Sequence, residues 1–391
     1  MEPIPDPAPP VAGRRRPAGF RARRGAAPSP PAQTPRHLHR SGPHSLAVSL
    51  PKSWIEGHAL SRGSLVWLHP RDDGRLEIAP SAPPAAGGAT DRVLSVEAAH
   101  FGEPEVLART VFGGYAVGYD RIDLFDAEGF DPDRRRELER TAHALVGLQV
   151  VFLDTHRARL QSFLDARRHP VPKVLARAGL VVEEMAERLT EAVRGSSPVP
   201  IAELGAMEVE SDRLYALTLR QLMLAQGDPA LARRLEVREP RDLLGGRVVG
   251  KVYEEIADIL CRAASELEAG LRGPAWPGRL REDLERHAEA LRTTLHDAAL
   301  ALQQSDRTVA HRVLRDREEG LRALLRTEQA LARARLPHRQ TASLAVFAWG
   351  VGTSRRLCGT IAEVALNQSI QSTATGSAPP PAASASAPQR A

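Results

Sequence analysis

The sequence predicts an α+β multidomain protein in which short β-rich segments precede a long all-α region. Apolar and polar residues alternate over short runs within residues 44–78 and 92–164, which is typical of half-buried strands. From residue 171 to residue 371 the apolar residues recur at helical spacing, and Leu and Ala dominate, as in helical bundles. Segments rich in Pro, Ala, Gly or Ser lie at residues 1–35, 81–90 and 372–391.

Composition restricts the class of protein. The chain has 391 residues, 42% of them apolar, and its net charge of +5 comes almost entirely from Arg, since it holds only three Lys. The two cysteines, Cys261 and Cys358, are too few and too far apart for a disulfide framework or a zinc ribbon, and they are expected to be reduced thiols. No apolar run approaches the roughly 18–20 residues of a membrane span, and the N-terminus lacks the apolar core of a signal peptide. We therefore expect a cytoplasmic protein without membrane insertion.

The first 35 residues are expected to be disordered, because a segment so rich in Pro, Ala and Arg buries too little apolar surface to offset its ordering entropy. Its basic residues are Arg14, Arg15, Arg16, Arg21, Arg23 and Arg24. A flexible basic arm can follow nucleic-acid phosphates. A solvated tail without a specific role is the alternative. The Ser-, Ala- and Pro-rich residues 372–391 are also expected to be disordered.

Residues 36–81 predict a small β-rich domain. A strand is expected over 44–50, a short helix over 51–60 and a β-hairpin formed by 65–69 and 75–78. Pro51 suits the first turn of the helix. About 45 residues form too small a core to be stable alone, so we expect dimerisation.

This segment resembles the SpoVT/AbrB swapped-hairpin DNA-binding domain. The resemblance lies in Ser-Leu-Ala-Val-Ser-Leu-Pro-Lys-Ser-Trp at 45–54, Leu-Ser-Arg-Gly-Ser-Leu-Val at 60–66 and Asp-Gly-Arg-Leu-Glu-Ile at 73–78. It implies a homodimer whose interleaved hairpins dock on DNA through basic residues. The matching basic positions are Arg36, Arg40 and Lys52, with His39 and His44 as further candidates.

Two features depart from that family. The turn glycine, Gly63, is followed by Ser64, where the family often has a small residue and then Asp. The basic face is also thin, at three Arg and Lys. A domain that only dimerises therefore remains the alternative.

Residues 92–165 predict a small α/β module. Strands are expected over 92–96, 121–125 and 148–153, helices over 104–112 and 131–145, and residues 158–164 close the module. Asp131 and Pro132 are a typical cap and first residue for the second helix.

Two runs of the module, Tyr115-Ala-Val-Gly-Tyr-Asp120 and Ala144-Leu-Val-Gly-Leu-Gln-Val150, resemble the module that links an AbrB-like domain to a PhoU domain in prokaryotic, notably archaeal, phosphate-uptake regulators. The Gly118-Tyr-Asp120 element is either a ligand loop or a turn between helix and strand.

The all-α region predicts six helices, over 171–194, 201–226, 243–271, 279–304, 307–335 and 340–370. A break at 273–277 divides them into two three-helix bundles, 171–272 and 276–371, which read as a repeat. Aligning 254–266 with 351–363 pairs Leu260 with Leu357, Cys261 with Cys358, and Glu266 with Glu363.

Two acidic pairs at helical spacing are the candidate functional residues. Glu208 and Asp212 lie on the second helix of the first bundle, and Glu254 and Asp258 on the third. Residues four apart share one face of a helix. If the two helices pack side by side, four carboxylates converge and form either a cation site or two solvated acidic faces.

The bundle region resembles PhoU, whose two three-helix repeats carry Glu/Asp-x-x-x-Asp pairs that bind metal. The resemblance covers 171–371 and implies Glu208, Asp212, Glu254 and Asp258 as ligands of a divalent or trivalent cation. Carboxylates suit Mg²⁺, Mn²⁺ or Fe. It further implies a regulator of phosphate uptake and phosphate-responsive transcription that acts through DNA, a phosphate-transporter ATPase or a sensor kinase. A dimeric metal-binding scaffold that does not bind DNA is the alternative.

No enzyme is expected, because the sequence lacks the Gly-rich nucleotide-binding, His-Glu-x-x-His and Gly-x-Ser-x-Gly motifs.

The second repeat differs from the first at the positions of the acidic pairs. Val351 and Arg355 replace the third-helix acids, and Asp316 is followed four residues later by Gly320. We predict that this repeat binds no metal and that Arg355 pairs with Asp316 or Glu319.

Overall fold

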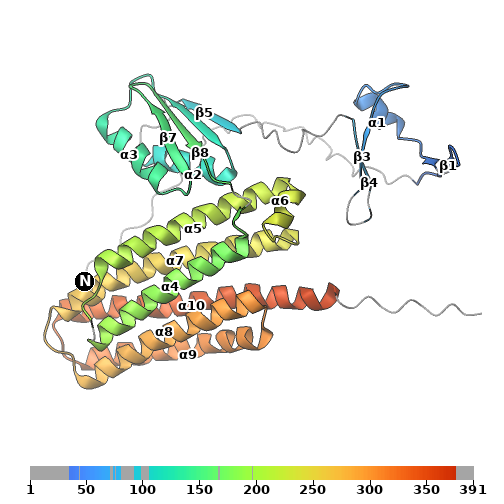
Figure 1. Cartoon of the computed structure of the whole chain (residues 1–391). Helices are drawn as coiled ribbons and strands as arrows, with labels where there is room; N and C mark the ends of the chain where they lie inside the picture. Colours follow the sequence, from blue (N-terminus) through green and yellow to red (C-terminus); the bar gives the residue numbers. More distant parts are fainter. Residues whose placement is uncertain are drawn as a thin grey trace, which may run out of the picture. The chain divides into compact units, whose positions relative to one another are not determined.

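The structure is a computed structural model that describes residues 35–43, 45–70, 74, 76–80, 92–97, 105–165, 168–195 and 197–375 (Figure 1). The expected basic arm, His44, the linker at 81–90 and residues 376–391 of the expected tail lie outside the described residues. The chain forms two compact units, residues 1–88 and residues 89–391.

The first unit consists of two small hairpins and one short helix. Its elements are β1 (His39–Arg40), β2 (Leu46–Ala47), α1 (Lys52–Gly57), β3 (Trp67–Pro70) and β4 (Leu76–Ala79). β1 pairs with β2 and β3 with β4, both antiparallel. The expected hairpin is confirmed, whereas the expected strand over 44–50 is reduced to two residues.

The described residues of this unit form no hydrophobic core. Among its residues whose burial the structure describes, none is buried. Leu46, Leu65 and Leu68 are 64%, 75% and 57% exposed. Much of the apolar surface of its described residues is therefore in contact with water.

The α/β module begins the second unit. Its elements are β5 (Val93–Glu97), α2 (Val106–Val117), β6 (Arg121–Phe125), α3 (Pro132–His143), β7 (Leu148–Leu153) and β8 (Arg157–Ser162). The sheet order is β5-β6-β8-β7, with β5 and β6 parallel and the other pairs antiparallel. The strands expected at 92–96, 121–125 and 148–153 are confirmed. Alternate residues such as Ile122, Leu124 and Leu160 are buried in the core of the module.

The remaining residues form a helical bundle (Figure 1). Its helices are α4 (Val171–Arg194), α5 (Ile201–Gly227), α6 (Pro229–Arg234), α7 (Pro240–Leu271), α8 (Gly278–Gln304), α9 (Arg307–Arg333) and α10 (His338–Thr375). The six expected helices are confirmed, and α6 is an addition. α7 packs against α5 and α10, and α4 packs against α8, around one continuous core that includes Tyr253, Leu260 and Phe347.

Two details of the bundle differ from the sequence prediction. Asp228 accepts hydrogen bonds from the backbone of Ala230 and Leu231 and so caps the short helix α6, which lies between the helices expected at 201–226 and 243–271. The last helix, α10, continues to Thr375, four residues beyond the expected end of the bundle. None of the helices in the described part of the chain combines the length and the apolarity needed to cross a membrane.

Candidate metal centre

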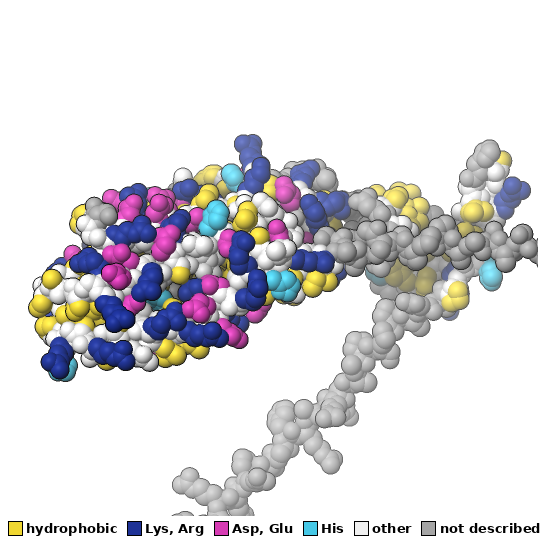
Figure 2. Space-filling model, turned by 90° about the horizontal axis from the view of Figure 1, so that it is seen from below, with side chains coloured by type: hydrophobic (Ala, Val, Ile, Leu, Met, Phe, Trp, Pro, Cys, Tyr) yellow, Lys and Arg dark blue, Asp and Glu magenta, His cyan; other side chains and the backbone are white. Residues whose placement is uncertain are grey.

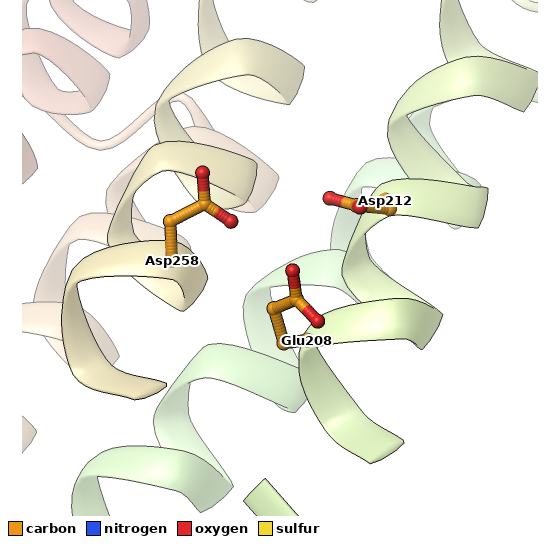
Figure 3. Close-up of side chains that lie close together, drawn as sticks. All are labelled: Glu208, Asp212 and Asp258. Atoms are coloured by element: carbon orange, nitrogen blue, oxygen red, sulfur yellow. The ribbon is translucent and has the colours of Figure 1, made fainter. Parts of the chain in front are cut away.

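Three carboxylates converge where α5 packs against α7. Glu208 and Asp212 lie one turn apart on α5, and Asp258 lies on α7, with one oxygen from each within 4.8 Å of the others. Figure 3 shows the three side chains pointing toward one another from the two facing helices. The first acidic pair and half of the second therefore share one location, because α5 and α7 pack side by side and residues four apart share one face of a helix.

Burial and mutual repulsion disfavour the charged forms of these groups. The pKa of Asp212 is raised from 3.8 to about 7, first by desolvation and then by the negative charges of Glu208, Asp258 and Glu254. Desolvation and the neighbouring charges of Asp258 and Glu254 raise the pKa of Glu208, and partial desolvation raises that of Asp258. A cation bound among these carboxylates would favour their charged forms and oppose these shifts.

No protein cation neutralises the cluster directly. Within the part of the chain that the structure describes, Glu208, Asp212 and Asp258 form no ion pair with a Lys or Arg side chain. Lys251 lowers the pKa of Asp212 from a distance, but its ammonium contacts Glu254 instead.

The fourth expected ligand, Glu254, lies outside the group of three. It accepts a hydrogen bond from Lys251, three residues earlier on α7, and Lys251 also lies 5.5 Å from the centre of the Tyr215 ring. This i,i+3 pair is a local helix contact that competes with ligation. Of the neighbouring acids, Glu210 accepts a hydrogen bond from Arg177 at 2.8 Å, and Glu255 is exposed.

The corresponding place in the second repeat contains a protein cation. Arg355 on α10 donates two hydrogen bonds to Asp316 on α9, one of them 2.7 Å long. The hydroxyl of Thr294 donates to the same carboxylate at 2.8 Å. The predicted pairing of Arg355 with Asp316 is confirmed, while Glu319, the other predicted partner, pairs with Arg326 at 2.7 Å.

Gly320 makes room for this pair. A Cβ atom at this position would lie 3.3 Å from Cδ of Arg355 and 3.5 Å from its Nε. A side chain at residue 320 would therefore press on the Arg355 stem, and the guanidinium occupies the space that a second α9 carboxylate would need.

The α/β module is attached to the same helix that carries Glu208 and Asp212. Arg220 on α5, only 1% exposed, donates to the carbonyl oxygens of Tyr115 and Tyr119 at 2.8 and 2.7 Å. It also forms an ion pair with Asp120 at 2.8 Å and lies over the Tyr115 ring. The Gly118-Tyr-Asp120 element is thus a turn, with Gly118 at φ +97, whose groups hold Arg220.

Sequence reasoning missed Arg220 as a structural residue. The signal available in the sequence was that Arg220 is the one charged residue in the largely apolar stretch 214–225. Its partners lie about 100 residues earlier in the chain, and nothing in the local pattern of α5 identifies them.

The three basic positions matched to DNA contacts are all on the surface of the first unit. Arg36 precedes β1, Arg40 ends it, and Lys52 begins α1. All three are exposed, as is His39. Lys52 lies 3.6 Å from Glu56, one turn further along α1, so part of its charge is compensated.

The bundle surface does not present one sign of charge over the face drawn in Figure 2. Arg and Lys side chains there are interspersed with Asp and Glu side chains.

Comparison with protein-family models, with curated proteins and with solved structures found no match for this chain.

Proposed function

We propose that the protein is a dimeric regulator that binds a hard cation in its helical bundle and DNA through its first unit. The observation that carries the proposal is the contrast between the repeats: three carboxylates without a protein cation in one, and an Arg355–Asp316 pair in the other. Together with the resemblances to PhoU and SpoVT/AbrB, this contrast favours control of phosphate uptake.

Mg²⁺, Mn²⁺ or an iron ion fits the candidate centre by its donor set. Hard cations take carboxylate oxygens, and Glu208, Asp212 and Asp258 supply at least three. A bound cation would favour the charged carboxylates of Glu208 and Asp212 and so lower their raised pKa values. Glu254 is close enough for its charge to raise the pKa of Asp212, and it is a fourth candidate ligand if its contact with Lys251 is broken.

Metal titration of the full chain tests this assignment. Calorimetry with Mn²⁺ on metal-stripped protein should give one tight equivalent per chain, and the Asp212→Asn/Asp258→Asn variant should give none. Glu255→Gln is the matched control, because Glu255 is an exposed acid on the same helix outside the cluster. Undiminished binding in the double variant would reject the site.

The lack of a core in the first unit supports homodimerisation. Its exposed leucines need a partner surface, and the swapped-hairpin resemblance provides a second copy of the same unit. Sedimentation analysis should show a dimer for the full chain and a monomer for a Leu65→Asp/Leu68→Asp variant. Leu180→Asp, an exposed leucine of α4 that is 55% exposed, is the control expected to stay dimeric.

DNA binding is proposed for Arg36, Arg40 and Lys52. Each phosphate contact should contribute about −0.9 to the slope of log K against log salt concentration. Arg36→Ala/Arg40→Ala should therefore flatten this slope by roughly two if both residues contact phosphates. A chromatin pull-down from phosphate-replete and phosphate-starved cells would identify the target sequences.

A second candidate is a dimeric metal-binding scaffold that acts on a phosphate-transporter ATPase or a sensor kinase without binding DNA. It is favoured by the small number of basic residues and by the Lys52–Glu56 contact. No binding to any duplex at low salt, with dimerisation and metal binding intact, would select the scaffold. Neither candidate includes catalysis, since the sequence carries no motif for it.

A further inference from the structure

The four-stranded sheet of the α/β module has an inner and an outer face. Ile122, Leu124 and Leu160 point inward and join residues of α2 and α3 in one core. Because successive side chains of a strand alternate, the residues between them lie on the outer face. The outer face carries Val93, Ser95 and Glu97 from β5, Arg121, Asp123 and Phe125 from β6, Arg157, Arg159 and Gln161 from β8, and Gln149 and Phe152 from β7.

Three exposed phenylalanines are concentrated on this outer face. Phe125, Phe152 and Phe163 are 41%, 49% and 61% exposed, and no other phenylalanine whose burial the structure describes is exposed. Single exposed apolar side chains are ordinary on protein surfaces. Three rings on one face of a sheet form a patch of the kind that marks an interaction site.

Backbone pairing places Phe152 and Phe163 on the outer face. The register of β7 shifts between Val150 and Phe152, and this β-bulge sets Phe152 opposite Arg159. Phe163 comes directly after β8, and its backbone N–H donates to the carbonyl oxygen of Gly147 at 2.8 Å. This bond extends the ladder between β8 and β7, so the alternation of β8 continues and puts the Phe163 side chain on the same face.

Guanidinium groups lie between the rings. In the antiparallel ladders Arg157 is opposite Phe125, and Arg159 is opposite Phe152. Arg157 is exposed and forms no ion pair within the part of the chain that the structure describes. Arg159 donates through Nε to Asp123 at 2.7 Å, and its side chain is still 47% exposed. Both cations can therefore donate hydrogen bonds to a bound anion.

The chemistry of the outer face favours nucleic acid over a second protein surface. Arg121 and Arg159 both contact Asp123 in the middle of the sheet, and a protein interface is depleted of charge at its buried centre. A nucleic acid offers base faces that stack on phenyl rings and phosphates that accept hydrogen bonds from guanidinium groups. Bases inside a duplex are already stacked on each other, so a single strand is the form that suits this face.

We propose that the outer face of the sheet binds single-stranded nucleic acid, with bases stacked on Phe125, Phe152 and Phe163 and phosphates bound by Arg157 and Arg159. This site uses none of the residues of the carboxylate cluster and none of the basic positions of the first unit. It therefore depends on neither metal binding nor duplex binding. DNA and RNA both present the required groups.

Probes with and without bases test this proposal on the full chain. The chain carries Arg36→Ala/Arg40→Ala, so that two of the duplex-binding positions proposed for the first unit are removed. Fluorescence anisotropy should show saturable binding of an oligothymidylate or oligouridylate of about 12 nucleotides, and an abasic oligomer of equal length and charge should bind at least about tenfold more weakly. Basic residues elsewhere in the chain meet the same phosphates in both probes, so the ratio of affinities reports stacking. The tighter of the two base-bearing probes distinguishes DNA from RNA.

Variants of the rings and of one arginine test the assigned residues in the same background. Phe152→Ala/Phe163→Ala should weaken binding of the base-bearing probe by roughly tenfold or more, whereas Phe152→Tyr/Phe163→Tyr keeps the rings and should retain it. Trp349→Ala is the matched control, because it removes a 55% exposed aromatic side chain of α10, outside the sheet. Arg157→Gln should flatten the slope of log K against log salt concentration by about 0.7. Thermal unfolding verifies that each variant is folded.

Equal affinity for the base-bearing and abasic probes would overturn the proposal and leave the outer face to a protein partner. A folded Phe152→Ala/Phe163→Ala variant that binds the base-bearing probe as tightly as Trp349→Ala does would also overturn it.

Discussion

Arg355 on α10 and Asp316 on α9 form a bidentate ion pair. In the sequence repeat, their positions correspond to those of the carboxylate cluster on α5 and α7. The Arg355 side chain is 5% exposed and that of Asp316 is 28% exposed, so solvent screens the pair only weakly. The guanidinium supplies a positive charge to Asp316 from within the chain. Among the described residues, Glu208, Asp212 and Asp258 have no such ion pair with a Lys or Arg side chain.

Removal of one partner should destabilise the second repeat. Arg355→Ala leaves a half-buried carboxylate without its cation, so we expect a loss of about 3 kcal/mol in the free energy of unfolding measured with urea. Arg322→Ala removes an exposed partner of Glu318 on α9 and should cost less than about 1 kcal/mol. Equal effects for the two variants would show that the Arg355 pair is no stronger than a surface contact.

The second repeat should gain a metal site when its carboxylates are restored. Gly320→Asp/Arg355→Asp places two acids beside Asp316, and loss of the Arg355 stem makes space for the new side chain at residue 320. Calorimetry with Mn²⁺ should then report two equivalents per chain in place of one. Gly320→Ala/Arg355→Ala opens the same space without carboxylates and should retain one equivalent. A single equivalent in both folded variants would contradict the proposed relationship between the repeats.

The metal-free protein should lose stability as the pH rises from about 4 to about 7. The pKa of Asp212 is raised in the folded state, so folding favours its protonated form, and that contribution disappears as the pH passes through the folded pKa of about 7. The loss is at most about 4 kcal/mol for a change from 3.8 to about 7. Denaturation in EDTA over this pH range would measure it.

Asp212→Asn is the control for that pH dependence, because the amide does not titrate and is isosteric with the protonated acid. This variant should be flatter in pH than the wild type and more stable than it at pH 8 without metal. Addition of Mn²⁺ should stabilise the wild type above pH 7 and leave the variant nearly unchanged. A wild-type profile as flat between pH 4 and pH 7 as that of Asp212→Asn would contradict the raised pKa.

Loss of Arg220 should loosen the α/β module without unfolding the bundle. Arg220→Met keeps much of the side-chain volume but removes one hydrogen-bond donor each from Asp120 and the carbonyl groups of Tyr115 and Tyr119. Amide hydrogen exchange in α2 should accelerate by roughly 100-fold, equivalent to about 3 kcal/mol. Arg177→Met, which removes an exposed partner of Glu210, should leave α2 exchange unchanged. Unchanged exchange in both variants would show that apolar packing alone holds the module.

Helical periodicity and chain-breaking residues were sufficient to locate the bundle. Pro200 and Pro277 precede helices by backbone rules that act locally, so the six helices could be placed within a few residues. The start of α7 at Pro240 lies three residues before the expected residue 243. The helix α6 was missed because Asp228 and Pro229 end one helix and begin another. A local rule gives the position of a break but does not determine the conformation of the next few residues.

Only those features of the candidate site that depend on the geometry of a single helix could be predicted from the sequence. The spacing of Glu208 and Asp212 fixed their common face, and the pairing of Arg355 with Asp316 could be inferred from the repeat. Glu254 was wrongly expected to join the cluster, because the prediction did not consider Lys251, which lies three residues earlier on the same helix and pairs with it. The contacts of Arg220 depend on tertiary packing between segments about a hundred residues apart, which no periodicity encodes.

The helix α5 carries both the carboxylate cluster and the anchor of the α/β module. Asp212 and Arg220 are eight residues apart on it, which is about 12 Å along the axis of an α-helix. Any displacement of α5 at Asp212 would also move the Arg220 guanidinium, because both residues lie on one continuous helix. The carboxylate cluster and the main polar attachment of the α/β module therefore share a single structural element.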